Sequence, residues 1–148
     1  MRLARSILIE RPPAAVFALV SDLKRGPEWF TGITRWEPRS RKRRGVGAAY
    51  RVLVRVGSVE AGGTLVVTEW EPPRTIAWES EQGIDQRGRW RLRPTASGTE
   101  LCLEVEFSLP GGPVGRLVER LAARTLARDM RATLLAARRI LEFEQAAA

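Results

Sequence analysis

The chain has 148 residues, a formal net charge of +8, no histidine and a single cysteine, Cys102. This length is typical of one domain with its own core, which we expect over residues 1–148. The missing residue types exclude Ser-His-Asp and Cys-His catalysis, an intrachain disulfide and the common zinc sites. We therefore expect no metal and no cofactor. The sequence contains neither a signal peptide nor a transmembrane segment, which favours a cytoplasmic protein.

The N-terminal part of the chain predicts one strand followed by two short helices. Residues 3–10 alternate between apolar and polar side chains, as a half-buried strand does. The stretch 12–21 begins with two prolines, which suit a helix start, and it carries an apolar side. A second short helical or irregular piece is expected from Asp22, and Gly26-Pro27 should end it.

The middle of the chain predicts strand after strand, separated by short turns, which indicates an antiparallel meander. The expected strands are residues 33–38, 48–56, 63–71, 74–81, 84–94 and 99–109.

A long helix is expected at residues 113–144, on the order of 45 Å in length and able to cross the whole sheet. Its expected apolar stripe consists of Val114, Val118, Leu121, Leu126, Met130, Leu134, Ala137 and Leu141. The opposite, solvated face carries arginines that could meet an acidic partner or a membrane surface: Arg116, Arg120, Arg124, Arg128 and Arg131.

The stretch RGRWRLRP, residues 87–94, places arginine at every second position. If residues 95–98 form the turn of a hairpin, Pro94 faces Thr99 and three arginines face three glutamates on the following strand. Opposite charges across strands stabilise a sheet, and a register shift by one residue would mix the two faces. We therefore interpret the arginines as a neutralised outer face, with Trp90 and Leu92 pointing to the concave side.

Five segments, taken in order, carry a resemblance to a known family. They are IERPPAAVFALVSDLKRGPEW (9–29), GVGAAY (45–50), VTEWEPPRTIAWE (67–79), GRWRLRPTASGTEL (88–101) and TLLAARRILE (133–142). The chain resembles the START-like helix-grip superfamily (SRPBCC), in its polyketide cyclase/dehydrase and lipid-transport branch. The resemblance implies an α+β helix-grip fold, in which a curved antiparallel sheet wraps around a long C-terminal helix, with two short helices after the first strand.

The resemblance also implies a cavity between the sheet and the C-terminal helix that binds a small hydrophobic molecule, such as a lipid, an isoprenoid or a polyketide-like compound. Such cavities are mostly apolar with few polar groups. The expected ligand-binding residues are Phe17, Trp29, Tyr50, Val52, Val54, Trp78, Trp90, Leu92, Leu103, Val105, Phe107, Leu121 and Met130.

One alternative is a polyketide aromatase/cyclase or dehydratase, because related enzymes steer and protonate a polyketide with polar residues in the cavity. Tyr50 is the only tyrosine and is expected to face inward. If Leu65 and Val67 face inward, strict alternation places Glu69 on the same inner face. If Val66, Thr68 and Trp70 face inward instead, Glu69 is solvated. A buried glutamate would have a raised pKa and could transfer protons. Asp85 and Asp129 are weaker candidates than Glu69, and Cys102, expected outside, receives no catalytic role.

Another alternative is a nucleic-acid or acidic-surface binder that uses the basic loop at residues 39–44. The loop has no interleaved aromatic residues, and no nucleic-acid-binding fold is recognisable, so this partner is disfavoured. Peripheral membrane contact and homo-oligomer formation are both left open by the sequence.

Overall fold

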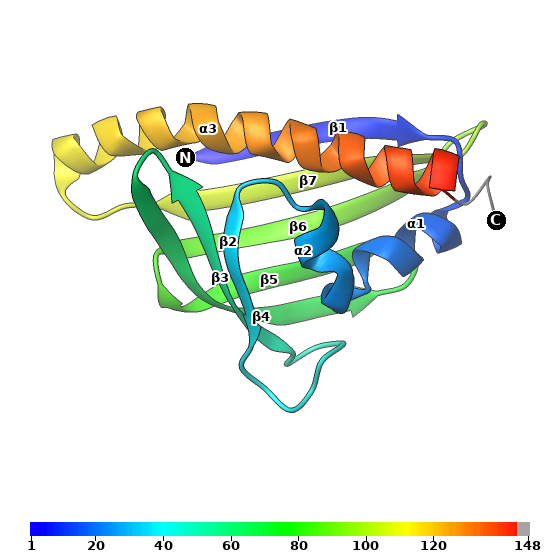
Figure 1. Ribbon diagram of the computed structural model, residues 1–148, viewed down its shortest axis with the longest axis horizontal. Helices are drawn as coiled ribbons and strands as arrows, with labels where there is room; N and C mark the ends of the chain where they lie inside the picture. The colour runs from blue at the N-terminus through cyan, green and yellow to red at the C-terminus, as the bar shows by residue number, and fades with distance from the viewer. Residues whose placement is uncertain (145–148) are drawn as a thin grey trace.

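The computed structural model describes residues 1–144, so the last four residues of the expected domain lie outside the described part (Figure 1). The chain begins with the strand β1, continues through three short helical segments, forms six further strands and finishes with the long helix α3 and one π-helical turn. The elements are β1 (Arg2–Ile9), α1 (Pro13–Val20), η1 (Leu23–Arg25), α2 (Gly26–Trp29), β2 (Ile33–Pro38), β3 (Ala49–Val56), β4 (Val59–Glu71), β5 (Thr75–Gly83), β6 (Asp85–Pro94), β7 (Thr99–Ser108), α3 (Gly112–Arg139) and η2 (Ile140–Glu144).

All seven strands form one antiparallel sheet in the order β1-β7-β6-β5-β4-β3-β2. The helix α3 packs along β1 and β7 and also contacts β3, near the other end of the strand order (Figure 1). One helix can touch both ends of a sheet only if the sheet curls around it. The expected helix-grip fold is therefore confirmed.

The hairpin of β6 and β7 has the register that the charge pattern predicted. Arg93 lies opposite Glu100, Trp90 opposite Leu103, and Pro94 opposite Thr99. The Nε atoms of Arg87 and Arg93 donate to their facing glutamates, Glu106 and Glu100, at 3.1 and 3.2 Å. The other two arginines do not pair with the residue that faces them on β7. Arg89 reaches across Ala77 of β5 to Glu69 on β4 at 2.7 Å, and Arg91 bridges diagonally to Glu104 at 2.9 Å. These ion pairs confirm a charged outer face whose arginines are largely matched by carboxylates.

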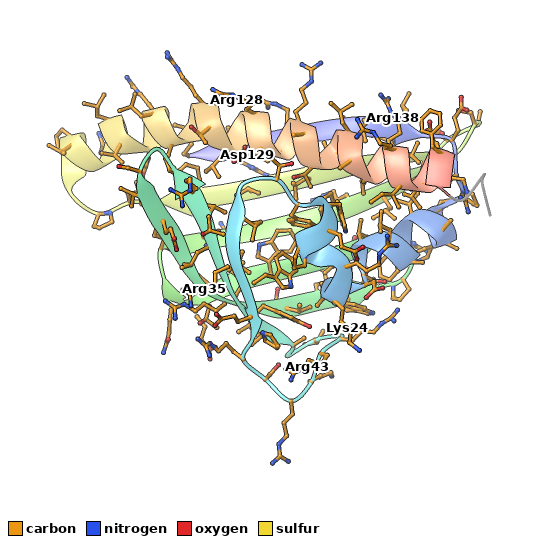
Figure 2. The ribbon with its side chains drawn as sticks, in the orientation of Figure 1. Lys24, Arg35, Arg43, Arg128, Asp129 and Arg138 are labelled. Atoms are coloured by element: carbon orange, nitrogen blue, oxygen red, sulfur yellow. The ribbon has the colours of Figure 1, made fainter. Side chains whose placement is uncertain are left out.

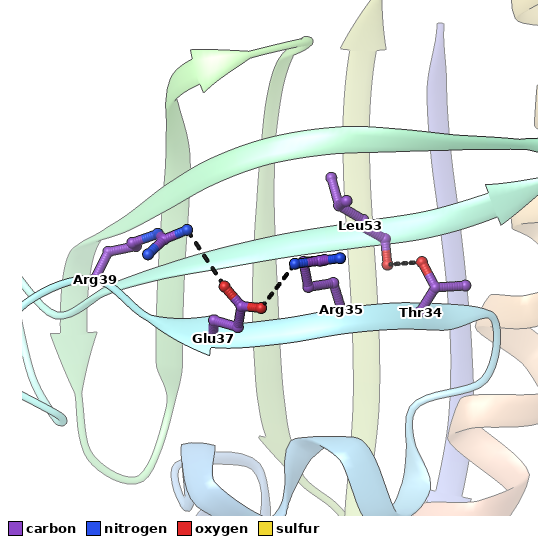
Figure 3. Close-up of polar contacts among 5 residues, drawn as sticks. All are labelled: Thr34, Arg35, Glu37, Arg39 and Leu53. Atoms are coloured by element: carbon purple, nitrogen blue, oxygen red, sulfur yellow. Dashed lines mark hydrogen bonds and ion pairs between the residues drawn. The ribbon is translucent and has the colours of Figure 1, made fainter.

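The edge strand β2 is also protected by charge (Figure 3). Glu37 lies between two arginines and accepts from Arg35 at 3.0 Å and from Arg39 at 3.3 Å. The hydroxyl of Thr34 donates to the carbonyl oxygen of Leu53 on the neighbouring strand β3. Charged side chains on an edge strand discourage pairing with a further strand.

Two expected boundaries are wrong. The helix α2 begins at Gly26 rather than ending there, because Pro27 lies in its first turn, where a proline has no backbone hydrogen bond to lose. The strand β4 begins at Val59 rather than at residue 63. Gly57 adopts a φ of +62°, which permits a tight turn and lets Val56 pair directly with Val59.

The expected apolar stripe of α3 is correct only in its C-terminal half, where Met130, Leu134, Ala137 and Leu141 are buried. Val114, Val118 and Leu121 are 71%, 45% and 59% exposed. A helix turns by about 100° per residue, so these three positions point about 120° or more away from the buried face. The buried residues of the N-terminal half are instead Gly115, Glu119 and Ala122.

The buried carboxylate of Glu119 joins α3 to the loop that precedes it. It accepts a hydrogen bond from the backbone N–H of Leu109 at 2.7 Å. We expect Glu119→Ala to lower the free energy of unfolding by about 1–3 kcal/mol, because the N–H of Leu109 would lose its partner. Arg120→Ala, at the exposed neighbouring position, should change it by no more than about 0.5 kcal/mol. Chemical denaturation measures both, and equal effects would contradict this role.

Candidate ligand-binding site

The inner face of the sheet, the segment from α1 to β2 and the helix α3 enclose a cavity of about 170 Å³. An apolar cavity of roughly 150 Å³ is large enough to bind benzene, so this space suits a small ring-sized molecule. The lining residues are Val20, Asp22, Leu23, Gly26, Trp29, Phe30, Thr31, Ile33, Trp36, Tyr50, Val52, Val54, Leu65, Val67, Ile76, Trp78, Gln86, Trp90, Leu103, Val105, Leu126, Asp129, Met130 and Thr133.

Most of the residues expected to bind a ligand line this cavity, although their role in binding stays a prediction. They come from α2, four different strands and α3, which the fold brings together from distant parts of the sequence. These residues are Trp29, Tyr50, Val52, Val54, Trp78, Trp90, Leu103, Val105 and Met130.

Four of the expected residues lie elsewhere. Phe17 is buried against Trp70, with ring centroids 5.8 Å apart, and Leu92 lies in the core on the strand β6, which α1 contacts. Phe107 is buried beyond the cavity, near the end of β7. Leu121 was expected to face inward but is exposed, for the reason of helical phase given above.

Two aromatic residues that the sequence analysis missed, Phe30 and Trp36, complete the cavity wall. The ring of Phe30 lies 4.5 Å from Trp29, 5.1 Å from Trp36 and 5.9 Å from Trp90. Trp36 in turn lies 5.9 Å from the ring of Tyr50. Pairing the strand 33–38 with the strand 48–56 in its true register would have revealed Trp36, because it faces Val52, a residue already expected to point inward.

Tyr50 lies in the cavity wall as expected, but its hydroxyl is already engaged. It donates to the backbone carbonyl oxygen of Arg43 at 2.9 Å. Burial raises the pKa of Tyr50; the charge of Arg43 opposes this shift and Asp22 adds to it. Tyr50 therefore stays protonated at neutral pH and uses its only proton for an internal hydrogen bond.

Glu69 does not reach the cavity, so of the two placements considered for it the outward one holds. The register of β4 against β5 shifts between Val67 and Glu69, which marks a β-bulge at Thr68. Val67 faces the cavity, and the bulge then moves Glu69 to the outer face, where it pairs with Arg89 at 2.7 Å. Strict alternation therefore does not hold along the whole of β4, because the bulge switches the faces to which its side chains point after Val67.

The carboxylates in the cavity wall belong to Asp22 and Asp129 rather than to the stronger sequence candidate. Asp129 lies between α3 and the loop leading into β2, as Figure 2 shows, and its carboxylate lies close to Gly32. Burial raises the pKa of Asp129, and the charge of Arg128 opposes this shift. Asp85, the other weak candidate, is exposed at the start of β6.

Other candidate groups lie outside the cavity. The basic residues 39–44 form an exposed loop between β2 and β3, and the guanidinium of Arg44 lies 5.6 Å from the ring centroid of Trp70. Cys102 lies opposite Arg91 on the outer face, and burial together with Glu104 and Glu100 raises its pKa. Among residues 1–144, no three His, Cys, Asp or Glu side chains gather as a metal site. No helix in this part of the chain is long and apolar enough to span a membrane.

The raised pKa of Asp129 gives a prediction for stability against pH. The folded state holds the proton of Asp129 more tightly than the unfolded state, so stability falls as pH rises from about 4 through the raised pKa. We expect Asp129→Asn to raise the melting temperature at pH 7 by a few degrees, and this gain should vanish below about pH 4. Asp85→Asn, at an exposed position, is the matched control. A constant gain at every pH, measured by thermal denaturation, would contradict the proton linkage.

Comparison with proteins of known structure gives the same fold over nearly the full chain. A protein from Thermus thermophilus superposes with a TM-score of 0.79 and 20% identity, covering 100% of this chain and 98% of that one. The Zhui aromatase/cyclase from Streptomyces sp. R1128 gives 0.76 and 18%, covering 97% of each chain. A START superfamily protein from Mycobacterium smegmatis gives 0.68 and 20%, covering 94% and 98%.

Comparison with curated proteins gives no match. The family model for polyketide cyclase/dehydrase and lipid transport proteins, in contrast, matches residues 1–142. These residues include every strand and helix that contributes to the cavity. The chain therefore belongs to the polyketide cyclase/dehydrase and lipid transport family, and it has the START-like helix-grip fold.

Proposed function

We propose that this protein binds a small hydrophobic molecule in the cavity between the sheet and α3. The observation that carries the proposal is the cavity itself, which is walled almost entirely by aromatic and aliphatic side chains. An apolar cavity is left unfilled only at a cost in packing energy, so a site of this kind is retained for an occupant. Lipid, isoprenoid and polyketide-like compounds are the ligand classes in keeping with the family.

The alternative of an aromatase/cyclase or dehydratase has support from the Zhui aromatase/cyclase, which shares the fold. The arrangement of polar groups gives it less support. Glu69 pairs with an arginine outside the cavity, and the hydroxyl of Tyr50 is bonded to the backbone. Proton transfer in the cavity would therefore depend on Asp22 or Asp129, and we favour ligand binding as the function.

The nucleic-acid alternative has little support. Most arginines of the outer sheet face are paired with glutamates, which a phosphate-binding face would not be. The single cysteine is in keeping with our proposal of a reducing, cytoplasmic location.

Filling the cavity provides a direct test of binding. We expect Val52→Trp to weaken the binding of naphthalene, a neutral fluorescent probe small enough for the cavity, about ten-fold or more, because the larger ring would occupy ligand space. Leu53→Trp is the matched control, since the next residue of β3 points to the opposite face of the sheet. Fluorescence titration measures both. Failure of the probe to bind the native protein, or equal loss in the two variants, would speak against the cavity as the site.

We also propose that the exposed apolar stripe of α3 contacts an anionic membrane. This stripe consists of Val114, Leu117, Val118 and Leu121, which are 45–71% exposed. By helical phase, Val118 and Leu121 fall within about 80° of the cavity residue Asp129, whereas Leu117 lies about 120° from it. Arginines at 116, 120, 124 and 128 flank it, and the only carboxylate between residues 112 and 128 is the buried Glu119. Apolar and cationic residues together on one helix surface suit an anionic lipid interface.

Vesicle sedimentation tests this contact. The protein should bind vesicles of phosphatidylcholine with phosphatidylglycerol, and binding should fall as salt is raised or when phosphatidylglycerol is omitted. Leu117→Ser with Leu121→Ser should weaken binding about ten-fold. Leu8→Ser, which alters a 57% exposed leucine of β1 instead of α3, serves as the control. A salt-independent result, or a dimer in solution that these two substitutions dissolve, would contradict membrane contact.

A further inference from the structure

Two indole N–H groups of the cavity wall are buried without a hydrogen-bond partner. These are the Nε1 atoms of Trp29 and Trp36, for which residues 1–144 offer no acceptor. Trp29 is only 4% exposed, and both residues line the cavity. A buried donor without an acceptor costs free energy on the order of 1–3 kcal/mol, and the indole nitrogen can only donate. Two such donors beside one cavity therefore call for an acceptor that the protein itself does not provide.

Both indoles belong to the same corner of the cavity. The ring of Phe30 packs against each of them, with centroid distances of 4.5 Å to Trp29 and 5.1 Å to Trp36. The side of the corner nearest the sheet is formed by Trp90, whose ring lies 5.8 Å from that of Trp29. One ring-sized molecule held between these aromatic faces could approach both N–H groups at its edges.

The charges of the wall restrict the ligand further. No arginine or lysine lines the cavity within the described residues, whereas two carboxylates, Asp22 and Asp129, do. An anionic ligand would leave water without a cationic partner and would approach these carboxylates, both of which are unfavourable. The hydroxyl of Tyr50 is committed to the backbone oxygen of Arg43, so it does not compensate.

We infer that the ligand is a neutral ring compound carrying carbonyl or similar acceptor oxygens, and that the indole N–H groups of Trp29 and Trp36 hydrogen-bond to these oxygens. This inference rests on the proposed function, since it concerns the same cavity. It distinguishes oxygenated ring compounds from pure hydrocarbons, which offer no acceptor, and from free carboxylic acids, which are ionised at neutral pH.

The test compares probes that share a ring system and differ in their oxygens. These are 2,3-dimethyl-1,4-naphthoquinone, whose methyl groups block attack by the thiol of Cys102, and the matched hydrocarbon 2,3-dimethylnaphthalene. The anionic probe is 2-naphthoate. We expect calorimetric titration of the full chain to give a dissociation constant for the quinone roughly ten-fold lower than for the hydrocarbon, with 2-naphthoate the weakest.

Two aromatic substitutions assign the preference to the indoles. Trp29→Phe and Trp36→Phe keep a ring but remove the N–H donor, so each should reduce the preference for the quinone while changing hydrocarbon affinity little. Trp70→Phe is the matched control, because Trp70 packs against Phe17 and does not line the cavity. Proton–nitrogen NMR of the unaltered protein gives a second measurement that does not depend on the variants folding. Two of the five tryptophan indole resonances should move downfield with the quinone and not with the hydrocarbon.

The possible results separate this inference from the proposed function. Equal affinity for quinone and hydrocarbon, or an unchanged preference in both tryptophan variants, would overturn the inference and leave cavity binding intact. Tighter binding of 2-naphthoate would overturn the neutral ligand class. If neither the quinone, the hydrocarbon nor naphthalene binds, the proposed function fails together with the inference.

Discussion

The antiparallel pairing of β6 with β7 is the constraint on which the cavity depends. Because side chains of a strand alternate between the two faces, one register decides the chemistry of both. Arg93 opposite Glu100 and Trp90 opposite Leu103 are two consequences of the same alignment. A shift by one residue would bring arginines into the cavity wall and expose tryptophan to water. The outer ion pairs are individually weak, but together they oppose such a shift.

The sequence predicted this part of the fold well, because periodicity and charge agreed on every residue of the hairpin. It predicted the strand β4 poorly for a specific reason. A bulge at Thr68 has no distinctive residue, yet it moves Glu69 from the inner to the outer face. Periodicity therefore assigns faces reliably only up to the first bulge, and the strongest acid–base candidate lay beyond one.

The helix α3 shows a second limit of pattern reading. Its apolar residues were taken as a single stripe, but they form two stripes, one buried and one exposed. The buried face of its N-terminal half uses Gly115, Glu119 and Ala122, which a search for large apolar side chains passes over. The large apolar residues there, Val114, Leu117, Val118 and Leu121, lie exposed at the surface instead. Exposed apolar residues of this kind, which the core does not use, suit a contact with another molecule.

The cavity wall also depends on residues without side chains. The ring of Trp36 lies against Gly26, and the ring of Trp78 lies against Gly88, so closely that a Cβ atom on either glycine would overlap the ring. Each tryptophan can therefore lie back against the backbone instead of filling the centre of the fold. A methyl group at either glycine would force the tryptophan ring beside it to move, and both of these rings line the cavity of about 170 Å³. Five tryptophans in a chain of this size would ordinarily fill a core. Here, two glycines keep two of them at the wall of the cavity.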